Sequence, residues 1–245
     1  MPVLILAFFV TALLYASVGF GGGSTYTALL ALSGLDYRVL PLLSLSCNIV
    51  VVAGSTVRFA RAGVTPWRSA ALLTALAAPA ALVGGLTPIS ETLFLTILGM
   101  SLLFAGGALL LKQSVSSAGP AKAARFMPLL AVPLGYLAGL VGIGGGIFLA
   151  PILHLVRWNS AKAVAATASL FILVNSMFGL IGQSLKGGTG MIIAAVDLGL
   201  PLMVAVAIGG QIGSLLALKY LPQRWIRLGT AALTIWVGAR LLLKM

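Results

Sequence analysis

Two glycine runs of the same form constrain this chain more than any other feature of its sequence. The first is Gly19–Gly23, in which Phe20 interrupts the glycines, and the second is Gly142–Gly146, with Ile143 at the matching place. The runs lie 123 residues apart in a chain of 245, and each follows one apolar stretch and precedes a shorter one. Each glycine costs a helix about 1 kcal/mol relative to alanine. We therefore expect both runs to interrupt helices.

The remainder of the chain is too apolar for a water-soluble domain. Hydrophobic residues make up 60% of it and charged residues 7%, and the mean hydropathy is +1.16. Ordinary globular domains carry about 25% charged residues, which cover their water-facing surface. The sequence thus predicts an all-α, polytopic transmembrane protein. Unwound backbone in lipid is tolerated only where protein or a water-filled cavity covers it, so we expect the two glycine breaks to face each other near a central site.

Apolar segments of helical length divide the chain into two similar halves. The segments expected in the first half are 2–18, 24–34, 39–57, 67–87 and 91–111. Those expected in the second half are 127–141, 147–156, 161–183, 191–218 and 225–243. A membrane span needs about 20 residues, whereas an eleven-residue helix rises only about 16 Å. The short segments are therefore half-helices or re-entrant pieces, and we expect eight to ten membrane segments in all.

The repeat boundaries follow from the one long polar stretch, at the middle of the chain. We expect a first transmembrane repeat at 1–111, a linker at 112–126 and a second repeat at 127–245. Ser46 and Ser169 match at the offset of 123 residues that separates the glycine runs, and Gly54 and Gly179 match at an offset of 125. Duplication of one unit is the economical explanation of these matches.

The 15 basic residues fix the expected orientation. When the chain is threaded through the membrane segment by segment, one side receives Arg58, Arg61, Arg68, Lys112, Lys122, Arg125, Arg157, Lys162, Lys219, Arg224 and Arg227. The other side receives only Arg38, Lys186, Arg240 and Lys244. Cytoplasmic loops are enriched in Lys and Arg, so we predict that the linker is cytoplasmic and that both termini lie outside, in a cell inner membrane. Five segments per half reverse the second half, which predicts an inverted repeat, the architecture of secondary transporters.

Composition also argues against several classes of function. The basic residues, which give a net charge of +12, are scattered singly between apolar segments, so we expect no nucleic acid partner. Cys47 is the single cysteine, which rules out an intrachain disulfide and a cysteine-rich metal site. An intramembrane enzyme would need paired acids or a histidine cluster, and the chain has one histidine, so we expect no catalytic residues. The expected partners are the lipid bilayer and a small substrate, without cofactor or metal, and homo-oligomerisation is left open.

The paired glycine runs are similar to those of a known family. The sequences Val-Gly-Phe-Gly-Gly-Gly and Val-Gly-Ile-Gly-Gly-Gly each precede a polar, serine-containing segment, and the pair resembles the sulfite exporter TauE/SafE family of membrane permeases. The resemblance covers nearly the whole chain and includes the duplicated layout. It implies a transporter of small sulfur-containing anions, such as sulfite or organosulfonates, that acts mostly in the outward direction.

A broken helix offers anion-binding groups at the start of its second piece. The first N–H groups there have no partner within the helix and carry a partial positive charge, so they bind anions without a lysine. The substrate-binding residues predicted in the first half are Gly21, Gly22, Gly23, Ser24 and Thr25. Those predicted in the second half are Gly144, Gly145 and Gly146, where Ile147 and Phe148 add no hydroxyl, so the site should be asymmetric. The alternative is that the glycines only allow helices to pack closely.

Polar residues inside the predicted spans are further candidates. Asn48 and Asn175 are predicted to line the substrate path, and helix–helix hydrogen bonding is the alternative for both. Asp197 is the one acid within a predicted span and is the candidate for proton coupling. Because it lies close to the start of its segment, a position at the outer interface is the alternative.

The function that this pattern favours is secondary transport of a small anion by alternating access around the glycine breaks. A passive anion channel is one alternative, and a non-transporting membrane assembly protein is another. The assembly protein would give the two breaks no reason to mirror each other. Uphill flux in liposomes under an imposed proton gradient separates a transporter from a channel.

Overall fold

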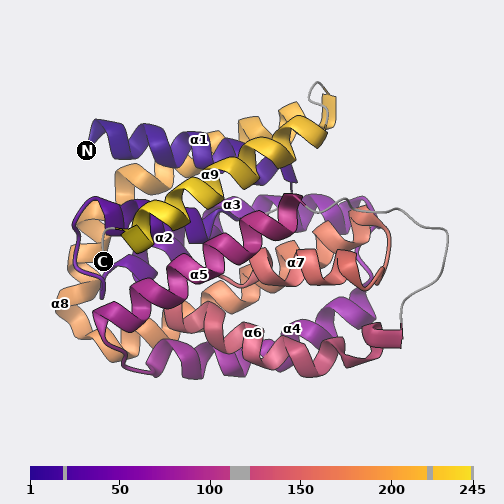
Figure 1. Ribbon diagram of the computed structural model, residues 1–245, viewed down its shortest axis with the longest axis horizontal. Helices are drawn as coiled ribbons and strands as arrows, with labels where there is room; N and C mark the ends of the chain where they lie inside the picture. Colours follow the sequence, from indigo (N-terminus) through magenta and orange to yellow (C-terminus); the bar gives the residue numbers. More distant parts are fainter. Residues whose placement is uncertain (19–20, 111–121, 220–222, 244–245) are drawn as a thin grey trace.

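The computed structural model describes residues 1–18, 21–110, 122–219 and 223–243 (Figure 1). Part of the first glycine run and most of the predicted linker therefore lie outside the described residues. Within them every regular element is a helix: α1 Pro2–Val18, α2 Gly23–Leu32, α3 Leu40–Arg61, α4 Trp67–Leu86, α5 Glu91–Leu110, the 3-10 helix η1 Lys122–Phe126, α6 Met127–Val141, α7 Gly146–Leu155, α8 Ala161–Lys219 and α9 Gln223–Leu243. The predicted all-α class is confirmed.

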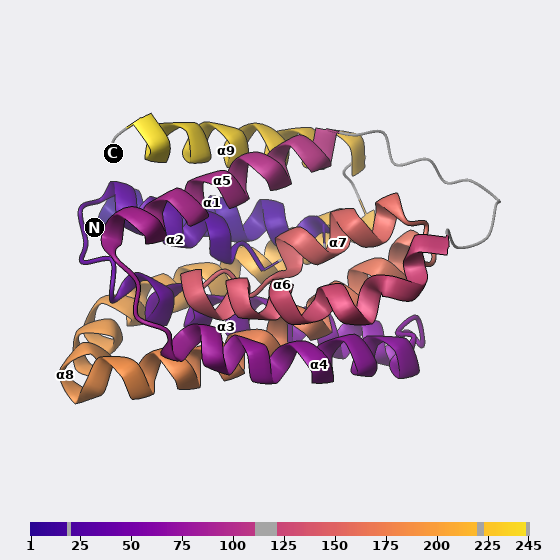
Figure 2. The ribbon, with the colours of Figure 1, turned by 60° about the horizontal axis from the view of Figure 1, so that its bottom comes forward.

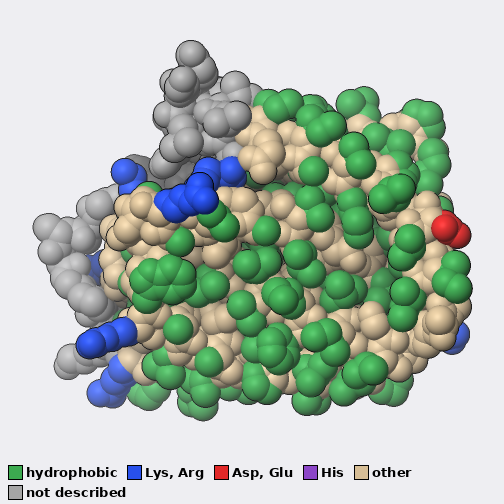
Figure 3. All heavy atoms as spheres, turned by 180° about the vertical axis from the view of Figure 1, so that it is seen from behind, with side chains coloured by type: hydrophobic (Ala, Val, Ile, Leu, Met, Phe, Trp, Pro, Cys, Tyr) green, Lys and Arg blue, Asp and Glu red, His purple; other side chains and the backbone are tan. Residues whose placement is uncertain are grey.

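Five of the described helices are long and apolar enough to cross a membrane. They are Leu40–Arg61, Trp67–Leu86, Glu91–Leu110, Ala124–Val141 and Ala161–Gly213, and shorter apolar helices lie at Pro2–Ala16, Gly146–Leu155 and Leu228–Leu243. The outer surface is apolar as well, since Val3 is 82% exposed and Leu129 73%. Figure 3 shows hydrophobic side chains over the middle of the molecule and charged ones at its ends. The predicted polytopic membrane protein is therefore confirmed.

Helix α8 is interrupted at a single residue. Gly188 has φ 71° and ψ 178°, which divides the helix into an N-terminal arm, 161–187, and a C-terminal arm, 189–219. A positive φ of this kind is available to glycine without steric cost. The two arms correspond to the two segments expected at 161–183 and 191–218, but the connection between them is shorter than the expected loop.

The two halves of the chain pack across each other through close backbone contacts. A Cβ added at Gly84 of α4 would overlap the Tyr136 carbonyl of α6, and one added at Gly213 of α8 would overlap the Leu13 carbonyl of α1. Leu13 and Tyr136 are separated by the same 123 residues as the glycine runs. The first helix of each half thus packs on the fourth segment of the other half. The duplication and the inverted relation of the halves stay predictions.

The ends of the helices gather at two opposite faces of the molecule. Helix α1 begins and α9 ends at one end, whereas α5 ends and η1 begins at the other (Figures 1 and 2). Figure 3, which views the molecule from behind, shows most of the visible Lys and Arg side chains at the end that holds η1. This distribution is the one that the predicted topology requires. The assignment of that end to the cytoplasm still rests on the charge bias alone.

Candidate functional site

The first glycine run lies between α1 and α2. Helix α1 ends at Val18 and α2 begins at Gly23, with Gly22 as the N-cap at φ 81°. No side chain caps this end of α2, so the N–H groups of its first turn have no acceptor within the helix. A Cβ at Gly22 would lie 2.9 Å from the Tyr26 hydroxyl, so only glycine fits this position without strain.

The second glycine run lies between α6 and α7 and has more residues in the left-handed region. Gly142, Gly144 and Gly145 have φ values of 71°, 73° and 80°. Gly142 is the C-cap of α6, and Gly145 is the N-cap of α7, again with no side-chain cap. The first turn of α7 therefore also begins with N–H groups that have no acceptor within their helix.

Asn48 of α3 lies between the two glycine runs. A Cβ added at Gly21 or at Gly23 would overlap its side-chain amide. From the second run, a Cβ added at Gly144 would lie 2.8 Å from Asn48 Nδ2 and 2.8 Å from the hydroxyl of Ser176. The two runs, which are far apart in the sequence, thus meet at one side chain because glycine leaves room for it on both sides.

The amide of Asn48 is buried and, within the described residues, lacks hydrogen-bond partners. Asn48 is 0% exposed, and neither its amide nitrogen nor its amide oxygen has a partner there. The hydroxyl of Ser176 is also buried and also lacks a hydrogen-bond partner there. Buried polar groups are hydrogen-bonded in about 90% of cases or more, and an unmade bond costs about 1–3 kcal/mol. Two adjacent groups of this kind, beside two helix N-termini, are suited to hold a ligand rather than to stabilise the fold.

Two hydroxyl groups hold the glycine runs in place. The carbonyl oxygen of Gly23 accepts hydrogen bonds from Thr27, at 2.8 Å, and from Ser44, at 2.7 Å. Thr27 also lies 3.4 Å from the carbonyl oxygen of Gly142 in the second run. Thr27 therefore joins the two breaks directly. Sequence reasoning did not select it, because a threonine within a short apolar helix gives no signal of a contact 115 residues away.

The predicted hydroxyl donor Thr25 is engaged elsewhere. Its hydroxyl lies 2.7 Å from the hydroxyl of Tyr15, which lies 2.5 Å from that of Thr234 in α9. Thr234 in turn donates to the carbonyl of Thr230 at 2.6 Å. This chain of hydroxyls ties α2 to α1 and α9, so the side chain of Thr25 has a structural role here. Ser24 is buried beside it.

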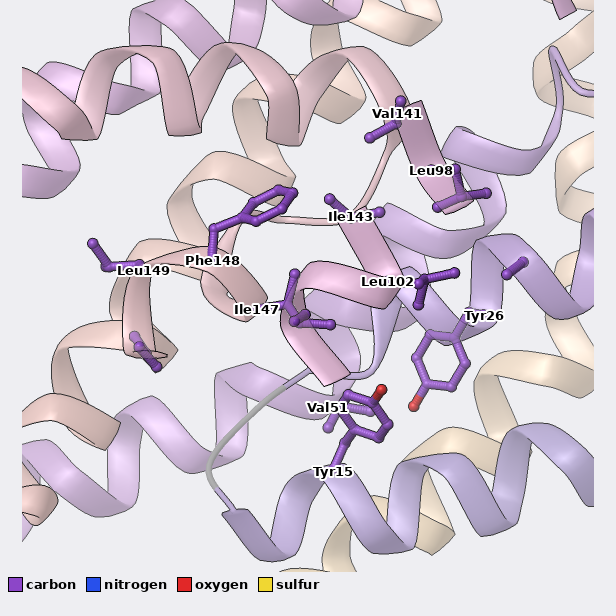
Figure 4. Close-up of a cluster of buried hydrophobic side chains, with 14 of the residues drawn as sticks. Tyr15, Tyr26, Val51, Leu98, Leu102, Val141, Ile143, Ile147, Phe148 and Leu149 are labelled. Atoms are coloured by element: carbon purple, nitrogen blue, oxygen red, sulfur yellow. The ribbon is translucent and has the colours of Figure 1, made fainter. Parts of the chain in front are cut away.

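Apolar side chains lie around the second glycine run. Figure 4 shows Ile143, Ile147 and Phe148 around the second break, with Leu98 and Leu102 of α5 near them. Ile147 and Phe148 stand where the first half has Ser24 and Thr25, so the polar groups of the two halves differ. An apolar enclosure lowers the local dielectric and strengthens hydrogen bonds to a charged ligand.

The two halves place their polar residues at different positions along the equivalent helices. Gly23 contacts Asn48, whereas Gly146, its partner at an offset of 123, contacts Ile172. Gly21 also contacts Val52, whereas Gly144 contacts Ser176. Asn48 therefore corresponds to Ile172, and Val52 corresponds to Ser176. Sequence analysis selected Asn175, the residue before Ser176, as the one that lines the substrate path.

The remaining predicted residues lie outside the contact between Asn48 and the two glycine runs. Asn175 is fully buried and its amide lacks a partner within the described residues, but it is not among the nearest neighbours of a Cβ added at any described glycine of the two runs. Asp197 is exposed on α8, outside the buried cluster. The roles predicted for these two residues stay predictions. Among the described residues there is no group of three His, Cys, Asp or Glu side chains that could hold a metal ion.

No basic side chain that the structure describes is buried, so the site offers neutral donors only. These are the first-turn N–H groups of α2 and α7, the amide of Asn48 and the hydroxyl of Ser176. Hydrogen bonds to an ionised acceptor are about twice as strong as those between neutral groups. The arrangement can therefore bind a small anion that has several acceptor oxygens.

Comparisons with known proteins identify the family of the chain. Residues 4–241 match the family described as "Sulfite exporter TauE/SafE". The chain is 34% identical to the "Probable membrane transporter protein y4hK" of Sinorhizobium fredii (strain NBRC 101917 / NGR234), over 98% of this chain and 97% of that protein. It is 31% identical to the "Probable membrane transporter protein YunE" of Bacillus subtilis (strain 168), over 35% of this chain and 29% of that protein. No solved structure matches the chain.

Proposed function

Because the chain belongs to the sulfite exporter TauE/SafE family, we propose that it is a secondary transporter that exports a small, sulfite-like oxoanion through a site between its two glycine runs. One observation carries this proposal. The Asn48 amide lies against glycines of both runs and has no hydrogen-bond partner among the described residues. A sulfur oxoanion or a sulfonate has several acceptor oxygens, which can satisfy Asn48 and the N–H groups of two helix N-termini together.

Burial of the site favours alternating access over an open channel. Asn48 and Ser176 are both 0% exposed, so an anion reaches them only when the surrounding helices move. A passive channel would keep its selective groups in contact with water from both sides at once. The helices that close over the site belong to both halves, and relative movement of two repeats is how secondary transporters expose a central site to each side in turn.

The test is flux of radiolabelled sulfite into proteoliposomes that contain the purified protein. We expect accumulation against the sulfite gradient when a proton gradient is imposed, because a transporter can couple the two movements. The Asn48→Leu variant keeps the branched shape of the side chain but removes the donor. One hydrogen bond to a charged group contributes about 1.5–3 kcal/mol, so binding should weaken about tenfold or more.

Thr74→Val is the matched control for this experiment. Thr74 is a buried polar residue of α4, and its hydroxyl donates to the Ala70 carbonyl of its own helix at 2.7 Å. The control should therefore keep the flux of the unchanged protein. Equal flux in Asn48→Leu and Thr74→Val would show that Asn48 does not bind the anion. Sulfite that moves only down its own concentration gradient, even under an imposed proton gradient, would favour the passive channel.

A further inference from the structure

Arg58 differs from the other basic residues that the structure describes. Arg38, Arg61, Arg68, Arg125, Arg157, Lys162, Lys186 and Arg240 are exposed, whereas Arg58 is half-buried in the last turn of α3. Its Nη1 donates to the Gln211 side-chain oxygen of α8 at 2.9 Å, and its Nη2 donates to the Ser55 hydroxyl at 3.4 Å. No carboxylate forms an ion pair with Arg58 in the described part of the chain. Its positive charge is thus held by neutral groups, which an anion could replace.

One face of α3 connects Arg58 to the central site. Asn48, Val52 and Ser55 follow each other at spacings of four and three residues, so they share one face of the helix. Val52 packs against Gly21 of the first glycine run, and Ser55 accepts the bond from Arg58. Seven residues of helix separate Asn48 from Ser55, a rise of about 10 Å. Because Val52 and Ser55 are buried, an anion passes along this face from Arg58 to the Asn48 amide only when the neighbouring helices move.

The corresponding turn of the second half is closed and uncharged. The offset of 124 residues that relates Asn48 to Ile172 and Val52 to Ser176 places Arg58 opposite Gly182, and Gln183 is the polar side chain next to it. It is buried and donates to the carbonyls of Gly139 and Leu140 at 2.8 and 3.2 Å.

The helix contacts beside Gln183 (the Gln183 end) differ from those beside Arg58 (the Arg58 end). At the Gln183 end two backbones touch, whereas at the Arg58 end a side chain makes the contact. At the Gln183 end, a Cβ added at Gly85 would lie 2.6 Å from the Gly179 carbonyl, so two backbones touch. At the Arg58 end, a Cβ added at Gly54 would instead lie 3.1 Å from the Gln211 side chain. At the Arg58 end the helices therefore touch through one exposed side chain, whereas at the Gln183 end they touch backbone to backbone.

We propose that Arg58 is a second anion-binding position, at which the transported oxoanion replaces Gln211 before it passes along α3 to Asn48. This inference rests on the proposed function. The guanidinium group presents a fork of N–H donors that matches an oxoanion, and it gives the anion a charged partner outside the neutral central site. By the charge bias of the loops, this end of α3 is the cytoplasmic one, where an exporter collects its substrate.

The experiment compares sulfite flux in proteoliposomes for Arg58→Gln, Arg58→Lys and Arg61→Gln. Arg61 belongs to the same last turn of α3 but is exposed, so Arg61→Gln removes the same charge from the same side of the membrane. We expect Arg58→Gln to raise the KM for sulfite about tenfold, as loss of a charged hydrogen bond does. Arg58→Lys should recover much of this loss, and Arg61→Gln should resemble the unchanged protein.

The dependence of the KM for sulfite on ionic strength tests the charge of Arg58. A merely structural role of Arg58 would not make the KM depend on salt. Because Arg58 is partly open to solvent, inert salt should screen it and raise the KM of the unchanged protein, and Arg58→Gln should lose this dependence. Equal KM values for Arg58→Gln and Arg61→Gln, with normal flux in the unchanged protein, would overturn the inference and leave the central site intact. An effect confined to vesicles of anionic lipid would also overturn it, because Arg58 would then bind lipid phosphate. Absence of sulfite flux in the unchanged protein would instead contradict the proposed function itself.

Discussion

Substitution of Gly144 by alanine is the sharpest test of the site between the glycine runs. Gly144 has φ 73°, and an added Cβ would lie 2.8 Å from both Asn48 Nδ2 and the Ser176 hydroxyl and 2.9 Å from a methyl group of Ile172. The new methyl group therefore reaches the two unpartnered donors together. Both side chains must move to make room for it.

The expected effect has two parts, one on stability and one on binding. Left-handed backbone costs a residue other than glycine about 1–2 kcal/mol, which lowers the stability of the folded protein. Displacement of Asn48 and Ser176 removes hydrogen bonds to the anion, and each such bond contributes about 1.5–3 kcal/mol. Since 1.4 kcal/mol corresponds to about a factor of ten in affinity, loss of one donor weakens binding by tenfold to about a hundredfold. Loss of both should abolish measurable flux.

Substitutions at two other glycines distinguish the effect on stability from the effect on binding. Gly34 and Gly63 have φ values of 80° and 66°, and an added Cβ at either position meets no atom within 4 Å. Gly34→Ala and Gly63→Ala therefore introduce the same backbone strain as Gly144→Ala without touching the site. We expect both controls to insert into the membrane and to transport normally.

Radiolabelled sulfite flux in proteoliposomes measures the binding effect, and the yield of monodisperse protein measures the effect on folding. Gly144→Ala should give protein at a level similar to that of the two controls but with flux at background. If Gly144→Ala transports sulfite with the KM of the unchanged protein, Asn48 and Ser176 do not bind the anion. The glycine runs would then serve only the close packing of helices.

Two further predictions concern topology and coupling. With Cys47 buried, cysteines introduced at Ala62 and Ser33, both exposed at helix ends, should react with a membrane-impermeant thiol reagent from opposite sides: Ala62→Cys from the cytoplasm and Ser33→Cys from outside. The reverse pattern would refute the orientation derived from the basic residues. If Asp197 couples proton movement to transport, Asp197→Asn should abolish stimulation by an imposed pH gradient but keep flux down a sulfite gradient. If a pH gradient still stimulates sulfite flux in Asp197→Asn, a group other than Asp197 couples proton movement to transport.

The helices of this chain could be predicted closely from the sequence, because glycine, proline and charge mark their ends. The segment expected at 2–18 is α1, and the one expected at 127–141 is α6. The connection inside α8 was less predictable. Lys186, Gly187, Gly188, Thr189 and Gly190 read as a loop, yet only Gly188 leaves the helical conformation. One residue with a positive φ redirects the chain, and the residues beside it keep helical backbone angles.

The composition of the site was predictable, but its contacts were not. Glycine runs and buried asparagines could be selected because both are costly in a membrane helix. The choice between Asn175 and Ser176 depends on helix register, since consecutive residues point about 100° apart. Offsets of 123 and 125 residues both occur between the halves, so the sequence leaves that register undetermined. The structure places Ser176, rather than Asn175, against Gly144.

The difference between the halves follows from the way that the two breaks converge. Asn48 touches Gly23 of one run and Gly144 of the other, so a single amide already occupies the space that the two halves share. A second amide at the equivalent position, Ile172, would bring another pair of polar atoms into the same space. Those atoms would compete for the same ligand oxygens, and one amide would be left buried without a bond, at a cost of about 1–3 kcal/mol. In the proposed site, an apolar residue at this place, with the smaller hydroxyl of Ser176 one turn further along, would let two similar halves form one site for one anion.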